Sequence, residues 1–218
     1  MKIKEANENI GGLSKPGKMP GSAWNIPASM CNRGSKLAKI KGTICSNCYA
    51  CKNRYLFPNV KNSLHNRLNK YNENPYLWKK SMVQLIQKED YFRWFDSGDL
   101  QSVEMLSDIV EVCVNTPNTK HWLPTRERGI LKEYLENNKF PDNLCVRLSA
   151  DMVGQYPAVL VNGCNISTVS EGTFTDTSMS TTVNNCPVSY NKNIKTCADA
   201  KCTNCWDNNI YHINYHTH

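Results

Sequence analysis

The sequence contains no apolar run long enough to cross a membrane. None of its 218 residues lies in a stretch that approaches the roughly 18 apolar residues needed for a membrane span. The first residues, MKIKEANENIGGLSK, carry charge but no apolar centre, so they do not resemble a secretory signal. Glycine and proline, with 11 and 10 residues, are too few for a fibrous or largely disordered chain. We therefore expect a folded cytoplasmic protein with no membrane partner.

Cysteine, in contrast, is abundant, with 11 residues. In a reducing cytoplasm, clustered thiols are more often metal ligands or catalytic groups than disulfides. Most of these cysteines fall in two groups at opposite ends of the chain. The groups are Cys31, Cys45, Cys48 and Cys51 near the start, and Cys186, Cys197, Cys202 and Cys205 near the end. This clustering predicts bound metal.

The chain also has an excess of positive charge. Its 26 Lys and Arg residues against 19 Asp and Glu give a formal net charge of +7. The basic residues concentrate in the first third, and Lys36, Lys39 and Lys41 are among them. Such a surface permits contact with nucleic acid or nucleotides. A solvated basic face with no partner is the commoner explanation.

Apolar periodicity predicts alternating strands and helices along most of the chain. The expected strands are 22–27, 91–95, 120–124, 144–150 and 166–170. The expected helices are two pieces within 58–89, the second capped by Asn74, then about 100–115 and about 127–138. Strand–helix–strand units of this length are right-handed and build a parallel sheet.

The fold class we predict is α/β, in the form of a partial (βα) barrel of about five to six parallel strands. A doubly wound sheet is the alternative. In this organisation residues 1–21 are an N-terminal arm, residues 22–175 form the barrel with its N-terminal cluster loop, and residues 176–218 form a Cys-rich metal-binding extension. The final HINYHTH is expected to be a solvated tail, because chain ends fray.

The spacing of the thiols bears on which metal they hold. Cys45, Cys48 and Cys51 stand two residues apart within GTICSNCYACKNRY. Structural zinc normally uses two separate knuckles, whereas three close thiols in one loop are nearer to the runs that hold a [4Fe–4S] cluster. The C-terminal group is a complete ligand set for zinc or for a second cluster. Alternatively, some of its thiols complete the first site.

Three stretches of the sequence resemble a known family: KMPGSAWNIPASMCNRGSKLAKIKGTICSNCYACKNRYLFPNV, FRWFDSGDLQSVEML and HWLPTRER. Together they are similar to the phage-encoded gene-product-eighty-eight domain, over about residues 17–207. The C-x2-C-Y-A element is also similar to a phage-associated family of radical S-adenosylmethionine (SAM)-like proteins. Both resemblances place the protein in the cytoplasm of a phage host.

The radical-SAM resemblance implies a partial barrel, one [4Fe–4S] cluster on Cys31, Cys45 and Cys48, and SAM at its fourth iron. Tyr49 would pack beside this cluster. The sequence departs from the usual C-x3-C-x2-C spacing, and Cys51 is available as a fourth ligand. If Cys51 ligates, no iron is open, and the cluster carries electrons or stiffens the loop.

Polar residues follow three of the predicted strands, where βα folds bind their ligands. They are Asp96, Ser97, Gly98 and Asp99 after strand 91–95, Thr125 and Arg126 after strand 120–124, and Arg147 and Ser149 in strand 144–150. The two carboxylates can bind ribose hydroxyls or the SAM ammonium, or act as acid and base. Asp99 also suits the cap of the next helix. We predict catalytic roles for Asp96, Asp99 and Arg126 and cofactor contacts for the others.

The leading hypothesis is therefore an iron–sulfur protein that reductively cleaves SAM to act on an unknown substrate. The alternatives are a non-catalytic module, stapled by Fe–S or zinc, that contacts nucleic acid, and a redox protein with fully ligated clusters. Cys113 and Cys145 lie in apolar patterns and are expected in the core, while Cys164 is left unassigned.

Overall fold

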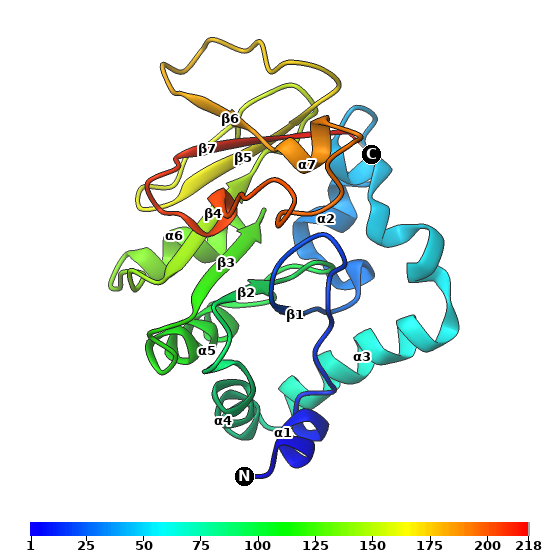
Figure 1. Cartoon of the computed structure of the whole chain (residues 1–218), viewed down its shortest axis with the longest axis vertical. Coiled ribbons are helices and arrows are strands. Elements are labelled where there is room, and N and C mark those ends of the chain that lie inside the picture. The colour runs from blue at the N-terminus through cyan, green and yellow to red at the C-terminus, as the bar shows by residue number, and fades with distance from the viewer. Residues whose placement is uncertain (218) are drawn as a thin grey trace.

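The computed structural model describes residues 1–217 and is built on one sheet of seven parallel strands (Figure 1). The strand order is β1-β2-β3-β4-β5-β7-β6. The strands are β1 (Ser22–Trp24), β2 (Tyr91–Trp94), β3 (Lys120–Thr125), β4 (Leu144–Ser149), β5 (Asn165–Ser170), β6 (Val183–Asn185) and β7 (His212–His216). The predicted α/β class and parallel pairing are confirmed, and the strands outnumber the five to six expected.

Helices lie close to all four predicted segments, and others form where the sequence predicted none. They are α1 (Ile3–Asn9), α2 (Asn32–Leu37), α3 (Pro58–Glu73), α4 (Pro75–Ile86), α5 (Val103–Val114), α6 (Arg128–Leu135) and α7 (Pro187–Tyr190). Short 3-10 turns are η1 (Ala28–Met30), η2 (Ile44–Asn47), η3 (Tyr49–Cys51), η4 (Asn53–Leu56) and η5 (Asn204–Trp206). None of the helices within residues 1–217 is both long and apolar enough to pass through a bilayer.

Two helix caps test the sequence signals directly. The Asn74 side chain accepts a hydrogen bond from the Leu77 N–H at 2.9 Å, so the predicted cap of α4 is confirmed. The predicted Asp99 cap of α5 is wrong. Ser102 takes that role and accepts from the Met105 N–H at 3.2 Å. The Asp99 carboxylate is instead bonded to the end of β3, as described below.

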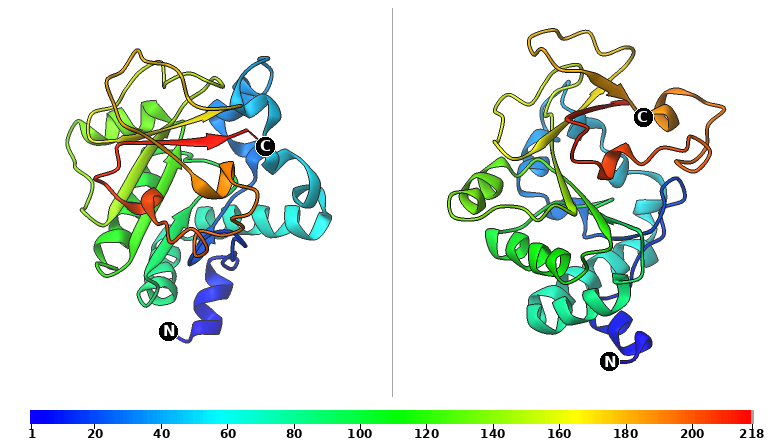
Figure 2. Two further views of the ribbon diagram at one scale, coloured as in Figure 1. Left: turned by 45° about the horizontal axis from the view of Figure 1, so that its top comes forward. Right: turned by 60° about the vertical axis from the view of Figure 1, so that its left-hand side comes forward.

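The sheet separates two different layers, because successive side chains of a strand point to opposite faces. One layer is formed by α4, α5 and α6, and it covers the apolar side chains of β2, β3 and β4, such as Phe92, Trp94 and Leu123. Residues 186–211 cover the other face (Figure 2). There Trp206 packs on the rings of Tyr91 and Trp122 and donates to the Phe92 carbonyl at 2.9 Å.

The two ends of the chain are more ordered than the sequence indicates. Residues 1–21 contain α1, which packs on α4 and buries Ala6 and Ile10 completely. Ser14 then forms an antiparallel bridge with Ala23, so the arm covers the outer edge of β1. The sequence did not predict α1, because Ala6 is the one buried residue within this short helix, which is too few for a clear period.

The prediction of a solvated C-terminal tail is also wrong. Residues 212–216 form β7, which pairs on one side with β5 and on the other with β6. His212 is fully buried and its Nε2 lies 2.7 Å from the Thr168 hydroxyl. Residues 176–218, expected as an extension, thus contribute two strands to the main sheet. His218 lies outside the described residues.

Two buried histidines predict sensitivity to acid. Burial lowers the pKa of His121 to about 3 and that of His212 to about 4, below the ordinary value of 6.5. The unfolded chain therefore binds more protons between pH 6.5 and these values, and stability falls as the pH falls through this window. Each histidine contributes at most about 1.4 kcal/mol per pH unit.

The pH dependence of the free energy of unfolding is measured by urea unfolding between pH 4 and pH 7. His121→Leu should flatten the pH dependence relative to the unmodified protein, although it also loses the contact with Thr116. His65→Leu, an exposed position on α3, is the control and should leave the slope unchanged. Equal slopes for all three proteins would contradict the assignment.

Candidate functional site

The first cysteine group lies at the carboxyl end of the sheet. Cys31 follows β1 after the single turn η1 and directly precedes α2. Cys45 lies in η2, which is tied to the end of β4 by a hydrogen bond from the Ile44 N–H to the Asp151 carbonyl at 2.9 Å. An antiparallel bridge between Thr43 and Met152 extends this contact. The segment that carries the thiols therefore docks on the edge where parallel-sheet proteins bind ligands.

A glycine in α2 brings two of the thiols together. A Cβ atom at Gly34 would lie 3.0 Å from the Cys31 Cβ and 3.6 Å from the sulfur atoms of both Cys31 and Cys45. The two sulfur atoms thus lie within twice 3.6 Å of each other. Cys48 is near enough to raise the pKa of Cys31. The structure therefore places Cys31, Cys45 and Cys48 near one another, and their role as metal ligands stays a prediction.

The three thiols lie near one another but do not form a ready-made metal site. Within residues 1–217, no three His, Cys, Asp or Glu side chains already form an arrangement that could hold a metal ion. Burial is the main cause that raises the pKa values of Cys31 and Cys45, so these thiols are protonated at neutral pH. Metal binding would release those protons. Cys51 is exposed and hydrogen-bonds to Cys48.

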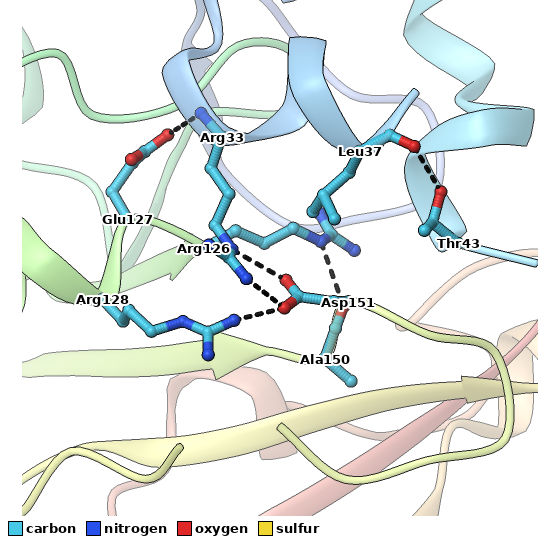
Figure 3. Close-up of polar contacts among 8 residues, drawn as sticks. All are labelled: Arg33, Leu37, Thr43, Arg126, Glu127, Arg128, Ala150 and Asp151. Carbon is cyan, nitrogen blue, oxygen red and sulfur yellow. Dashed lines mark hydrogen bonds and ion pairs between the residues drawn. The ribbon is translucent and has the colours of Figure 1, made fainter. Parts of the chain in front are cut away.

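Charged residues at the ends of β3 and β4 fix α2 in place (Figure 3). The Arg33 N–H, in the first turn of α2, donates to Glu127 at 2.7 Å. The Arg33 side chain donates to both oxygens of Asp151, at 3.0 Å from Nε to Oδ1. Arg128 donates to the same carboxylate. We call Arg33, Glu127, Arg128 and Asp151 the docking network.

The segment between α2 and η2 is fixed by a buried threonine, also drawn in Figure 3. The Thr43 hydroxyl donates to the Leu37 carbonyl at 2.7 Å and accepts from the Ser46 N–H at 3.1 Å. It thereby joins the end of α2 to the start of η2. Sequence reasoning missed Thr43 and the docking network, although Glu127, Arg128 and Asp151 all lie within three residues of a strand end.

The predicted catalytic residue Asp99 lies inside the protein and joins two strand ends. Its carboxylate accepts from the Thr125 hydroxyl at 2.6 Å, the Arg126 N–H at 2.9 Å and the Leu100 N–H at 2.8 Å. Burial raises the pKa of Asp99 to about 6. Asp99 and Thr125, both predicted site residues, therefore contact each other and brace β2 against β3.

The other residues of the glycine turn brace β2 against the end of β1. The Ser97 hydroxyl donates to the Ile26 carbonyl at 3.0 Å. Gly98 has a φ of +84°, and a Cβ there would lie 2.3 Å from Ile26 Cγ1. Phe95, just before the turn, also has a positive φ, of 54°. A bulky residue in this region is strained, and such strain is concentrated at functional sites.

Asp96 connects the sheet to the cysteine loop. Its carboxylate pairs with Arg93 at 2.8 Å and accepts from the Tyr55 hydroxyl at 2.6 Å. Its carbonyl accepts from the hydroxyl of Tyr49, next to Cys48 in the chain. Tyr49 is 37% exposed as a residue, while its hydroxyl is bonded to the Asp96 carbonyl and burial raises its pKa to about 12.

The remaining predicted residues lie apart from this turn. The Arg126 side chain donates to the Ala150 carbonyl at 3.1 Å and not to Asp96. Ser149 accepts from the Ser167 hydroxyl at 3.1 Å. Arg147 is fully buried in β4 and all five of its N–H donors bond to the chain itself, which leaves none for a cofactor. Their acceptors are the carbonyls of Asn204, Cys205, Asp207, Ile210 and Tyr211.

The second cysteine group lies along the segment that Arg147 holds. Cys186 directly follows β6. The Cys202 N–H donates to the Cys197 carbonyl at 3.0 Å, and the Cys205 sulfur lies 3.1 Å from the Tyr215 hydroxyl. Burial, then Cys186 and Cys202, raise the pKa of Cys197 to about 11. These four thiols are therefore electrostatic neighbours.

The three other cysteines lie inside the protein. Cys113 and Cys145 are fully buried, which confirms them as core residues, and Cys164 joins the main apolar core. Cysteines of this kind behave as small apolar side chains.

Nearly the whole chain is similar to one known family. The family model described as Gene product 88 matches residues 1–214. The chain belongs to the phage gene product 88 family. No curated protein and no solved structure matches it. The family resemblance predicted from the three sequence stretches is thus confirmed.

This gene product 88 chain places one further residue, Arg93, between the two cysteine groups. Its guanidinium lies 4.4 Å from the Trp122 ring and close to Tyr49, Tyr215 and Cys205. Its Nε has no hydrogen-bond partner in the described chain, residues 1–217. Sequence reasoning missed Arg93, since a single arginine within YFRWF gives no sign of what faces it.

Proposed function

We propose that this gene product 88 protein is an iron–sulfur protein with radical-SAM-like architecture, which uses SAM on a substrate still to be identified. The observation that carries the proposal is the position of the Cys31 and Cys45 sulfurs, both 3.6 Å from the Cβ that Gly34 lacks. These thiols stand at the carboxyl end of a parallel sheet, where α/β enzymes bind their cofactors. Cys48 completes the proposed set.

The residues fit a [4Fe–4S] cluster by the chemistry of their donors. Soft thiolates favour iron–sulfur clusters and zinc over hard cations. Because Gly34 has no side chain, no Cβ stands at the position 3.6 Å from the sulfur atoms of both Cys31 and Cys45. A cluster held by these thiols would supply the electron for reductive cleavage of SAM, drawn from a low-potential donor outside the chain. Cys51 is the candidate fourth ligand that would prevent this.

The chain's own residues have defined tasks in this proposal. The docking network keeps the helix after Cys31 on the ends of β3 and β4. Tyr49 and Asp96 link the cysteine loop to β2. The order of β1 to β5 in the sheet follows the chain, with α4, α5 and α6 on one side, and this supports a partial (βα) barrel. Asp96 and Arg126 remain the proposed polar contacts to SAM or substrate.

The second cysteine group is proposed to hold a further metal centre. Four thiols on one segment suit either an auxiliary [4Fe–4S] cluster or zinc. Tyr215 at 3.1 Å from Cys205 would tune that sulfur by a hydrogen bond. Metal binding here would also fix residues 186–211 over the sheet.

The test is metal and sulfide analysis of anaerobically purified protein, followed by EPR spectroscopy with and without SAM. We expect about four iron atoms per chain for one cubane and about eight for two. SAM should change the EPR spectrum of the reduced protein, and Cys51→Ser should retain that response. A colourless protein with stoichiometric zinc, or a spectrum indifferent to SAM in both proteins, would contradict the SAM function.

A nucleic-acid-binding module is the second candidate, favoured by the exposed basic residues beside the first cysteine group. Lys36, Lys39 and Lys41 are all exposed in and just after α2. If phosphates bind there, replacing the three lysines with alanine should weaken the binding of nucleic acid and reduce the salt dependence of that binding. Unchanged retention would remove this candidate.

A further inference from the structure

A cavity of about 420 Å³ lies between the N-terminal arm, the ends of β1 and β2, and α3. We call it the arm pocket. The residues that matter for its chemistry are Lys15, Arg54, Tyr55, Asn59, Arg67 and Asp96. A volume of this size lies within the range that holds a nucleotide-sized ligand.

A buried arginine in the arm pocket lacks an anionic partner. Arg67 is only 7% exposed, yet it lines the cavity. Its Nε donates to the Gly12 carbonyl at 2.8 Å, while its two terminal nitrogens have no acceptor among residues 1–217. Burial lowers the pKa of Arg67, because it removes water from around the charged guanidinium. A buried guanidinium without an anion is costly, so the pocket is suited to receive one.

The net charge of the arm pocket is positive. Lys15 and Arg54 are exposed at its mouth, and neither forms an ion pair within the described part of the chain. The single carboxylate, Asp96, is already paired with Arg93 at 2.8 Å and hydrogen-bonded by Tyr55. Three cations are thus available to a ligand, and Asn59 adds a neutral polar group.

We propose that the arm pocket binds a small molecule through a phosphate group. A phosphate monoester carries about two negative charges at neutral pH, and its oxygens match the planar fork of an arginine. A single carboxylate would leave two of the three cations uncompensated. Asp96 and Asn59 remain for hydroxyl or amine groups of the same ligand. This site stands whether or not the cysteines hold iron.

The position of the arm pocket connects it to the first cysteine group. Tyr55 and Tyr49 are both bonded to Asp96, and their rings meet edge to face at 6.0 Å. Tyr49 is the neighbour of Cys48 in the chain. A ligand anchored by Arg67 would therefore reach toward the thiols across Asp96.

The experiment is isothermal titration of the full chain, at constant ionic strength, with adenosine 5′-monophosphate, adenosine, inorganic phosphate and succinate. We expect the two phosphate-bearing probes to bind, adenosine not to bind, and succinate to bind at least fivefold more weakly. Arg54→Gln should weaken the phosphate-bearing probes about tenfold, and Arg67→Gln should abolish their binding. Lys61→Gln, an exposed position on α3 outside the pocket, is the matched control and should change binding less than twofold.

Arg67→Gln removes a buried hydrogen bond, so the circular dichroism spectrum of this variant is compared with that of the unmodified protein. If Arg67→Gln does not fold, the effect of Arg54→Gln on phosphate binding is the deciding measurement. The proposal is overturned if neither phosphate-bearing probe binds, or if succinate binds as tightly as they do. It is equally overturned if Lys61→Gln weakens binding as much as Arg54→Gln, because the attraction would then be a general effect of surface charge.

Discussion

Replacing Gly34 with valine is expected to lower metal affinity at the first cysteine group at least tenfold while the fold is retained. Even a single Cβ would lie 3.0 Å from the Cys31 Cβ and 3.6 Å from the Cys31 and Cys45 sulfurs. The valine methyl groups would extend further and occupy the space in which the sulfurs must converge. Valine is a better helix former than glycine, so α2 gains no intrinsic penalty.

The control for Gly34→Val is Gly129→Val in α6. Apart from the adjacent residues and the backbone of α6 itself, no atom lies within 4 Å of a Cβ built at Gly129, so this change tests valine in a helix without a steric clash. Metal per chain is measured after purification and after dialysis against a chelator, and the free energy of unfolding is measured in urea. If Gly34→Val holds as much metal as Gly129→Val, the thiols beside Gly34 are not the site.

The local patterns of the sequence predict the centre of the fold well. The apolar period of α5, the Asn74 cap of α4 and the strands β2 to β5 all depend on residues close together in the chain. These signals survive in the structure because tertiary packing agrees with them. The Asp99 cap failed for the opposite reason: a distant partner, Thr125, binds its carboxylate instead.

The ends of the fold could not be predicted in this way. β6 is only the three-residue segment VNN, and β7 is HINYH, in which the polar residues His212 and Asn214 are buried together with Ile213, so neither segment resembles a typical half-buried strand. Their stability comes from pairing, including that of β7 with β5, and from buried polar contacts such as His212 with Thr168. Such contacts join positions far apart in the chain and leave no local pattern.

The candidate site also contains some features that local sequence patterns predict and others that depend on residues far apart in the chain. The grouping of the cysteines is visible in the sequence because their spacing is local. The docking network is not, since Arg33 and Asp151 are 118 positions apart. Only the position of Asp151 near a strand end, two residues after the last residue of β4, could have marked it as a site residue.

Replacing Asp151 with alanine is expected to destabilise the protein by about 2 kcal/mol and to loosen residues 31–47. The carboxylate accepts from Arg33 and Arg128, and its own side chain is only 11% exposed. Its removal leaves two guanidinium groups without an acceptor. The Arg128 side chain is 17% exposed and that of Arg33 is 34%, so solvent offsets more of the loss at Arg33.

Urea unfolding gives the change in stability, and amide hydrogen exchange shows where it falls. Faster exchange should be concentrated in α2 and η2, because the docking network holds these elements on the sheet. Metal affinity should fall as well, since α2 begins directly after Cys31. The control, Glu73→Gln, removes the exposed pair with Lys70 and should cost less than about 0.5 kcal/mol. If exchange in Asp151→Ala becomes faster by the same factor throughout the chain, Asp151 supports the whole sheet and not the placement of the cysteines in particular.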